Sequence, residues 1–143
     1  MGESLSIYDI LKESFDLKEN DIKSYSPLTL AYIGDAVYEI IIRTIVVSDG
    51  NTQVNKMHKK SSNLVKAETQ ANIIKAIMDD LSEEELAAYK RGRNAKSYTS
   101  AKNASISDYR MATGFEALIG YLYLSGQTYR MTEIVKLGLS RVQ

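Results

Sequence analysis

One apolar stretch, from Leu28 to Val47, constrains the fold of this chain more than any other feature. It follows Ser26–Pro27, a cap and first-turn pair typical of the start of a helix. Its residues are apolar on most faces of a helix, which predicts a central and buried element. Asp35, Glu39 and Arg43 interrupt the stretch, and a membrane span would rarely tolerate such charges. We therefore predict a long core helix and no membrane contact.

Two capping pairs predict the starts of further helices. Ser6 with Asp9, and Ser82 with Glu85, have the spacing at which a serine and an acid satisfy the free N–H groups of a first turn. Glycine is the preferred residue just past a helix end, so the helix that Ser82 opens is predicted to end at Gly92.

A second apolar helix is predicted near the C-terminus, capped by Ser107 and stopping at Gly126, and a last helix follows it. A helical pattern also runs from Val54 to Leu81, with a joint near Ala67 whose form the pattern leaves open. The chain has one proline and 143 residues, which favours helices and suffices for one core. We predict an all-α fold and a single domain over residues 1–143.

Composition limits the compartment and the chemistry. The chain has no cysteine, which excludes disulfides, thiolate metal sites and cysteine nucleophiles. The N-terminus lacks the basic start and apolar run of a signal peptide. The expected location is the cytoplasm.

Charge is segregated although the formal net charge is zero. Residues 50–67 and 90–102 contain basic side chains and no acid, whereas several acids cluster between Asp79 and Glu85. Such segregation can create a basic surface on a neutral protein. Solvated helix ends and a solvated loop explain the same pattern, and charge alone leaves both interpretations open.

Asp35 and Glu116 each lie within an otherwise apolar helix. An ionised carboxylate near a core is costly unless it is paired, hydrogen-bonded or bound to metal. Hard divalent ions such as Mg²⁺ commonly use one or two protein carboxylates, which makes a shared metal site one explanation. Structural ion pairs are the other, because Arg43 is at helical spacing from Glu39 and Arg110 is near Glu116.

Other chemistry finds little support. His58 is the single histidine, which excludes a histidine-pair ribonuclease, and its flanking lysines favour a surface or phosphate contact. No Gly-rich nucleotide loop is present. Four tyrosines fall in the apolar helices and are interpreted as packing residues: Tyr32, Tyr38, Tyr121 and Tyr123.

The two acidic helices also carry a family resemblance. LAYIGDAV, from Leu30 to Val37, resembles the signature of ribonuclease III, and FEALIGYLYL, from Phe115 to Leu124, is similar to its second acidic motif. SSNLVKAETQANI, between them, resembles the intervening helix. MHKKSS and KRGRNAKS look most like the short Mini-III members. Because the chain ends soon after its last helix, we expect no double-stranded RNA-binding domain.

The resemblance implies an all-helical homodimer that cuts double-stranded RNA with Mg²⁺ and leaves 5′-phosphate ends. Asp35 and Glu116 match the catalytic and metal-binding acids of the family. Full-length ribonuclease III has further acids at the positions of Ala31, Leu28 and Thr113. The site of this chain therefore has fewer carboxylates, and the number of metal ions is left open. In the expected mechanism, Asp35 and Glu116 hold Mg²⁺, and a metal-activated water attacks the phosphorus in line.

The resemblance also suggests partners. Mini-III relatives mature large-subunit ribosomal RNA precursors, so a stem of that RNA is the expected substrate, with ribosomal particles or proteins as further partners. Shape recognition of an RNA duplex suits basic, hydroxyl and amide side chains. We assign RNA binding to the following residues: Lys59, Lys60, Arg91, Arg93, Asn94, Lys96, Ser97 and Lys102.

Two other functions compete with this interpretation. A non-catalytic RNA- or ribosome-binding module could have the fold without the chemistry, and the missing acids fit that class. Asp35 and Glu116 are both present, however, which favours an enzyme. A helical interaction protein without RNA would require both motifs and the basic segments to be coincidental.

Overall fold

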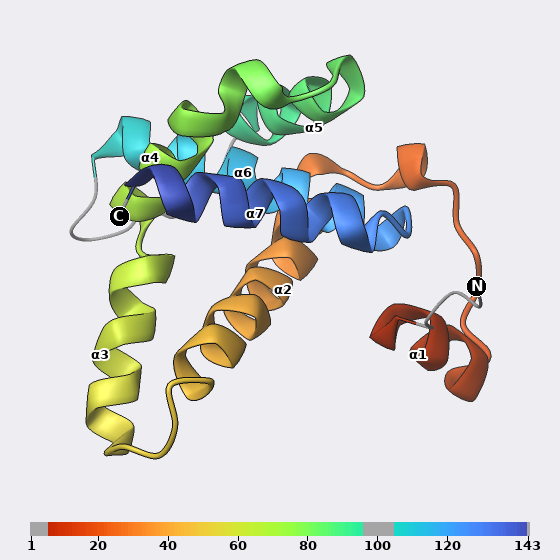
Figure 1. Ribbon diagram of the computed structural model, residues 1–143. Coiled ribbons are helices and arrows are strands. Elements are labelled where there is room, and N and C mark those ends of the chain that lie inside the picture. The colour runs from red at the N-terminus through yellow and green to blue at the C-terminus, as the bar shows by residue number, and fades with distance from the viewer. Residues whose placement is uncertain (1–5, 96–104, 143) are drawn as a thin grey trace.

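The computed structural model describes residues 6–95 and 105–142. Over these residues it contains only helices and their connections, and no strand (Figure 1). The helices are α1 (Ile7–Phe15), η1 (Ile22–Ser24), α2 (Pro27–Val47), α3 (Val54–Val65), α4 (Ala67–Ile77), η2 (Met78–Asp80), α5 (Glu83–Asn94), α6 (Ile106–Leu124) and α7 (Thr128–Val142). The predicted all-α class is confirmed.

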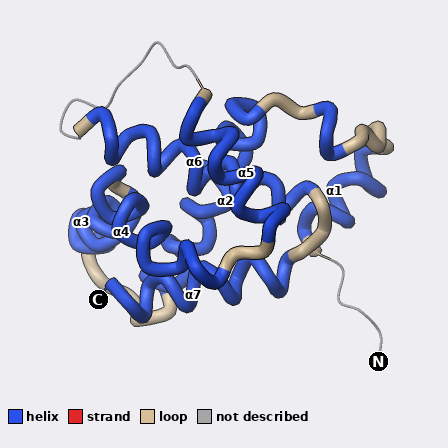
Figure 2. Tube along the Cα trace, turned by 90° about the horizontal axis from the view of Figure 1, so that it is seen from above, coloured by secondary structure: helices blue, strands red, loops and turns tan. Residues whose placement is uncertain are grey.

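Helix α6 is the centre of the core. It contacts α2, α4, α5 and α7, and the view from above shows α3 and α1 towards opposite sides of the molecule (Figure 2). Phe115, Leu118 and Ile119 of α6 are completely buried, and the Phe115 ring meets the Tyr38 ring of α2 edge-on at 5.2 Å between centroids. The apolar stretch that dominates the sequence is therefore a core helix, as predicted. No helix among the described residues is both long and apolar enough to cross a membrane.

The helix starts follow the predicted caps in all but one case. Ser6, Ser26 and Ser82 each accept a hydrogen bond from a backbone N–H of the first turn. The prediction for α6 was wrong by two residues, because Ser105 rather than Ser107 is its cap and accepts from the backbone N–H of Asp108.

The predicted end of α5 at Gly92 was also wrong, since the helix continues to Asn94. Gly92 is buried in its interior, where a Cβ atom would lie 2.6 Å from the Cβ of Ala117 in α6. The glycine therefore allows close packing of α5 on α6 and does not terminate the helix.

Lys66 forms the joint that the sequence left open. Its extended backbone, with ψ of 155°, separates α3 from α4. Two side chains of α4 bond the free carbonyls at the end of α3: the Thr69 hydroxyl donates to the Asn63 carbonyl at 2.6 Å, and the Gln70 amide donates to the Val65 carbonyl at 2.7 Å. Side chains thus replace the missing helical hydrogen bonds at the joint.

A buried ion pair fixes α7 to α5. Glu85 is 4% exposed and accepts two hydrogen bonds from the Arg130 guanidinium, at 2.8 and 2.9 Å. Arg130 also donates to the carbonyl of Asp80, at the end of η2. One guanidinium of α7 therefore connects this helix to both η2 and α5.

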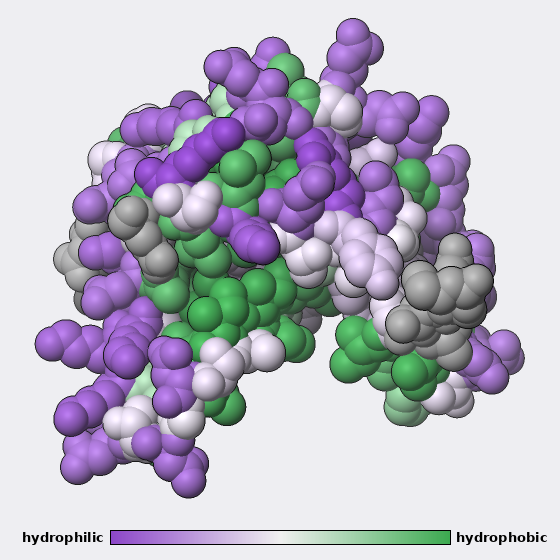
Figure 3. Space-filling view, in the orientation of Figure 1, coloured by the Kyte–Doolittle hydropathy of each residue, from purple (hydrophilic) through white to green (hydrophobic). Residues whose placement is uncertain are grey.

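Part of the surface is apolar. Figure 3 shows hydrophobic side chains gathered below α7 and over α2. A groove of about 720 Å³ lies here, with Ile41 and Ile45 of α2 facing Val135 and Leu139 of α7.

The predicted packing role of Tyr32 was wrong, because 82% of this residue is exposed, whereas Tyr38 is buried in the core.

Candidate active site

Two glycines bring the backbones of α2 and α6 into contact. A Cβ atom on Gly34 would lie 1.7 Å from the carbonyl oxygen of Glu116, and one on Gly120 would lie 1.9 Å from the carbonyl oxygen of Leu30. Neither position can accept a larger residue without moving a helix backbone. The crossing places Asp35, the neighbour of Gly34, beside Glu116.

The two carboxyl groups interact directly. Asp35 is exposed and Glu116 is half-buried, so the pair sits where the core meets solvent. Burial, the charge of Asp35 and a hydrogen bond between the two side chains together raise the pKa of Glu116 to about 8. Without a cation, the Glu116 carboxyl therefore holds a proton at neutral pH.

Gln70 is the third side chain at this site, and the sequence analysis gave it no role. Its amide nitrogen lies 3.4 Å from Oε2 of Glu116, and this hydrogen bond opposes the rise in the Glu116 pKa. A glutamine in the otherwise apolar register of α4 was the only sequence signal for it.

Three positions at which full-length ribonuclease III has further acids are occupied here by Leu28, Ala31 and Thr113. Ala31 and Thr113 are buried, and the Thr113 hydroxyl donates to the Tyr109 carbonyl in its own helix. Among residues 6–95 and 105–142, no group of three or more acids, histidines or cysteines could hold a metal ion. The donor set described here is thus two carboxylates, which suits a hard divalent cation that keeps several water ligands.

The alternative of structural ion pairs applies to one acid and fails for the other. Glu39 pairs with Arg43 at 3.1 Å, as the helical spacing predicts. Glu116 has Asp35 and Gln70 as its partners, and no ion pair joins it to Arg110. Glu116 thus lies beside a second acid, an arrangement that a bound cation would stabilise.

The predicted RNA-binding residues fall in two separate regions. Lys59 and Lys60 are exposed on α3, which extends from α4 away from α5 (Figure 1). On α5, the Arg91 guanidinium donates to the Tyr25 carbonyl at 3.3 Å. Lys96, Ser97 and Lys102 lie outside the described residues. The described residues do not bring the two basic regions into one cluster.

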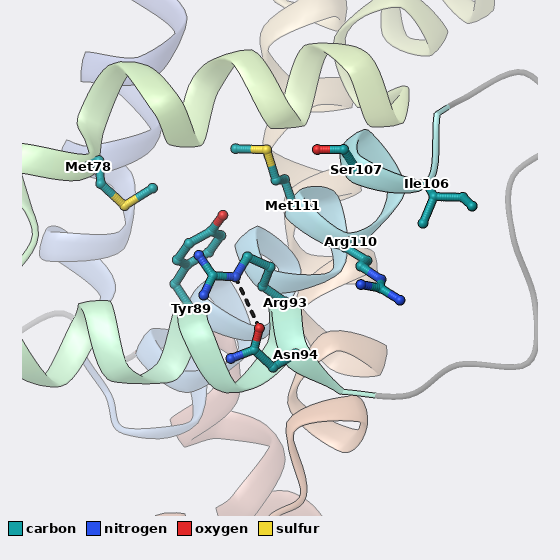
Figure 4. A pocket seen from close by; sticks show the side chains of 8 residues that line it. All are labelled: Met78, Tyr89, Arg93, Asn94, Ile106, Ser107, Arg110 and Met111. Carbon is teal, nitrogen blue, oxygen red and sulfur yellow. Dashed lines mark hydrogen bonds between the residues drawn. The ribbon is translucent and has the colours of Figure 1, made fainter.

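Arg93 and Asn94 line a cavity of about 470 Å³ between the end of α5 and the start of α6 (Figure 4). Arg93 lies over the ring of Tyr89, 5.6 Å from its centroid, and donates to the Asn94 side chain at 3.2 Å. Arg110 of α6 lines the same cavity. This side of the molecule therefore carries cations in a concave surface.

A match to a known protein family identifies the relatives of this chain. The family described as Ribonuclease III domain matches residues 28–127, which contain both acids of the site and the glycine crossing. The chain belongs to the ribonuclease III family. The signature resemblance of the two acidic motifs is thereby confirmed.

Several curated relatives of this ribonuclease III domain carry the same name. A Mini-ribonuclease 3 of Clostridium tetani is 58% identical over 85% of this chain and 82% of its own length. Another, of a Thermoanaerobacter species, is 46% identical over 96% of this chain and 97% of its own length. The Mini-III resemblance is confirmed, and these similarities support an endoribonuclease of the ribonuclease III type.

A solved structure shares the architecture. The crystal structure of a Fusobacterium nucleatum protein superposes with a TM-score of 0.77, at 33% sequence identity, over 82% of this chain and 96% of the other. The arrangement of helices around α6 is therefore common to both proteins.

Proposed function

We propose that this ribonuclease III domain is a divalent-metal-dependent endoribonuclease that cleaves double-stranded RNA. The observation that carries the proposal is the Asp35–Glu116 carboxyl pair, which the α2–α6 crossing brings together at the edge of the core. Both acids lie within the matched family region.

Asp35 and Glu116 would hold Mg²⁺ in this proposal. When bound, such an ion can activate water and offset the charge that a phosphodiester develops in the transition state. The chain's own contribution is to hold the two carboxylates together at a solvent-accessible position, and to release the proton of Glu116 when a cation replaces it. No side chain is needed as a general base.

Binding of the duplex is assigned to the basic regions of α3 and α5. Lys59 and Lys60 are exposed, and Arg93, Asn94 and Arg110 surround the cavity at the end of α5. Cationic and amide side chains contact phosphates and 2′-hydroxyls, which are the groups that an A-form duplex presents. Arg91, Lys96, Ser97 and Lys102 complete the predicted surface.

We further propose a homodimer, so that each of two sites cuts one strand of a duplex and leaves a 5′-phosphate. Tyr32, a large and almost fully exposed side chain in the core helix α2, lies one turn from Asp35 and is available for contact with a second copy. Light scattering should give twice the mass of one chain, and a monomer that cleaves both strands would contradict the dimer.

The proposed substrate is a stem of the large-subunit ribosomal RNA precursor, in the cytoplasm, with ribosomal particles or proteins as further partners. This assignment rests on the Mini-III resemblance. It predicts that a duplex from such a precursor is cut at defined positions, whereas an unrelated duplex of equal length is cut more slowly or elsewhere.

The experiment that tests the activity is cleavage of an end-labelled RNA duplex with Mg²⁺, beside the Asp35→Asn and Glu116→Gln variants. Glu39→Gln serves as the matched control, because Glu39 is an acid of the same helix that pairs with Arg43. Cuts in both strands that disappear with chelator and in both site variants, and persist in the control, would support the enzyme. Salt-sensitive binding without cleavage would favour the non-catalytic RNA-binding module.

A further inference from the structure

The Gln70 side chain joins two parts of the molecule through one nitrogen atom. It lies in α4 and is only 3% exposed. Its amide nitrogen donates to the carbonyl of Val65, the last residue of α3, at 2.7 Å and lies 3.4 Å from a carboxylate oxygen of Glu116. The same group therefore contacts the end of the basic helix and the candidate metal site.

The amide oxygen of Gln70 shows that packing alone does not account for this residue. It is buried and has no hydrogen-bond donor among residues 6–95 and 105–142. A buried acceptor without a partner is destabilising, and an apolar side chain of similar length would avoid that cost. What an apolar side chain could not supply is the pair of N–H groups, so these are the useful part of Gln70.

One N–H group has a structural role that another residue shares. Thr69 also bonds a free carbonyl at the end of α3, that of Asn63, at 2.6 Å. Among the described residues, Gln70 donates a hydrogen bond to Glu116 and Thr69 does not. The difference between Gln70 and Thr69 is thus the contact with the metal-site acid.

We propose that Gln70 is a positioning residue for the metal site, which holds the Glu116 carboxylate toward Asp35 and fixes the α3–α4 joint relative to it. A glutamate side chain has several rotatable bonds, and ordering it costs free energy. With only two carboxylates in the described site, the orientation of each one decides cation affinity. Groups that hydrogen-bond a metal ligand commonly change metal affinity by about 10- to 100-fold.

The inference rests on the proposed function, in that Glu116 must be a metal ligand. It adds a residue on a third helix, so the site is formed by α2, α4 and α6.

The test compares Gln70→Met with Thr69→Val in the full chain. Both variants lose a hydrogen bond at the α3–α4 joint, but only Gln70→Met loses the bond to Glu116. The two readouts are the dissociation constant for Mn²⁺, measured on the protein without RNA, and kcat and KM for duplex cleavage. Should Gln70→Met fail to fold, Gln70→Asn replaces it, because its shorter side chain keeps the amide and cannot reach Glu116.

Gln70→Met is expected to weaken Mn²⁺ binding by about 10-fold or more. It should lower kcat while KM for RNA changes little, and Thr69→Val should leave both readouts near wild type. Equal Mn²⁺ affinities for the two variants would overturn the inference.

The Mn²⁺ measurement separates this inference from the proposed function. If wild-type Mn²⁺ binding depends on Asp35 and Glu116 but the duplex is not cut, the proposed nuclease fails, and the role of Gln70 is still decided by the affinities. If Mn²⁺ binding depends on neither carboxylate, the positioning role is overturned with the site itself.

Discussion

At the scale of single residues, the Glu116 carboxyl links the proposed metal binding to stability. Its pKa in the folded, metal-free protein is about 8, against an ordinary value of 4.5. Between these values the folded state binds more protons than the unfolded state, so stability is highest at low pH and falls as pH rises through this window. The slope for one such group is at most about 1.4 kcal/mol per pH unit.

The Glu116→Gln substitution should remove the loss of stability that wild type shows as pH rises. In chelator, the variant is expected to be more stable than wild type at pH 9 by roughly 1 to 3 kcal/mol, and to differ less at pH 5. Denaturant unfolding across this pH range provides the measurement, with Glu39→Gln as the control. A wild-type stability that rises from pH 5 to pH 9 would contradict the assigned environment of Glu116.

The sequence predicted the acids of the site and missed their partner. Asp35 and Glu116 are recognisable because charge is costly in apolar helices and because both lie in family motifs. Gln70 is not, since a single glutamine in a mixed helix is ordinary until α4 is known to lie on α6. Tyr32 was misinterpreted because periodicity marks α2 as buried without telling which side of its N-terminal half stays open.

At the scale of elements, the α2–α6 crossing is the least tolerant feature of the fold. Gly34→Ala would put a methyl group against the Glu116 carbonyl, where only backbone movement can relieve the contact. We expect a loss of more than about 3 kcal/mol in unfolding free energy, or no folded protein. Gly126→Ala, in the open turn before α7 with a positive φ, should cost about 1 kcal/mol. Similar losses in the two variants would argue against the close crossing.

The Glu85–Arg130 pair gives the second test of an element contact. Arg130→Met leaves the 4% exposed Glu85 carboxylate without its guanidinium. The expected cost is about 3 to 5 kcal/mol, because the buried charge loses its cation and keeps only the Ser82 backbone N–H as a partner. Arg141→Met, which removes an exposed pair with Asp80, should cost less than about 1 kcal/mol. Thermal unfolding of the two variants compares them directly.

Helix starts were easier to predict than helix ends. A serine with its hydrogen bonds marks a start locally, and Ser6, Ser26 and Ser82 were all identified from sequence. Gly92 has the properties of a helix end, yet it serves the contact between α5 and α6. Sequence cannot separate these uses of glycine, because it does not show which helix packs against Gly92 in the folded chain.

At the scale of the whole molecule, RNA binding should depend on salt despite a net charge of zero. On duplex DNA, each phosphate contact contributes about 0.9 to the steepness with which log affinity falls as log salt concentration rises. A similar dependence is expected for an RNA duplex. Arg93→Glu is expected to weaken duplex binding by about 10-fold or more and to reduce that slope. Lys136→Glu makes the same kind of charge change on α7, beside the apolar groove, and should leave the slope unchanged. Fluorescence anisotropy at several salt concentrations measures the affinity and the salt slope of both variants. If the two substitutions had equal effects, α5 would not belong to the RNA-binding surface.

Asp35 and Glu116 are proposed to form one metal site that cleaves RNA. Single-turnover cleavage of a duplex at saturating Mg²⁺ should be measured for Asp35→Asn, Glu116→Gln and the double variant, each shown to be folded. Residues that act as a unit give losses that do not add. We therefore expect the double variant to be no slower than the worse single variant. Losses that multiply in the double variant, or a single variant that cleaves at the wild-type rate, would contradict it.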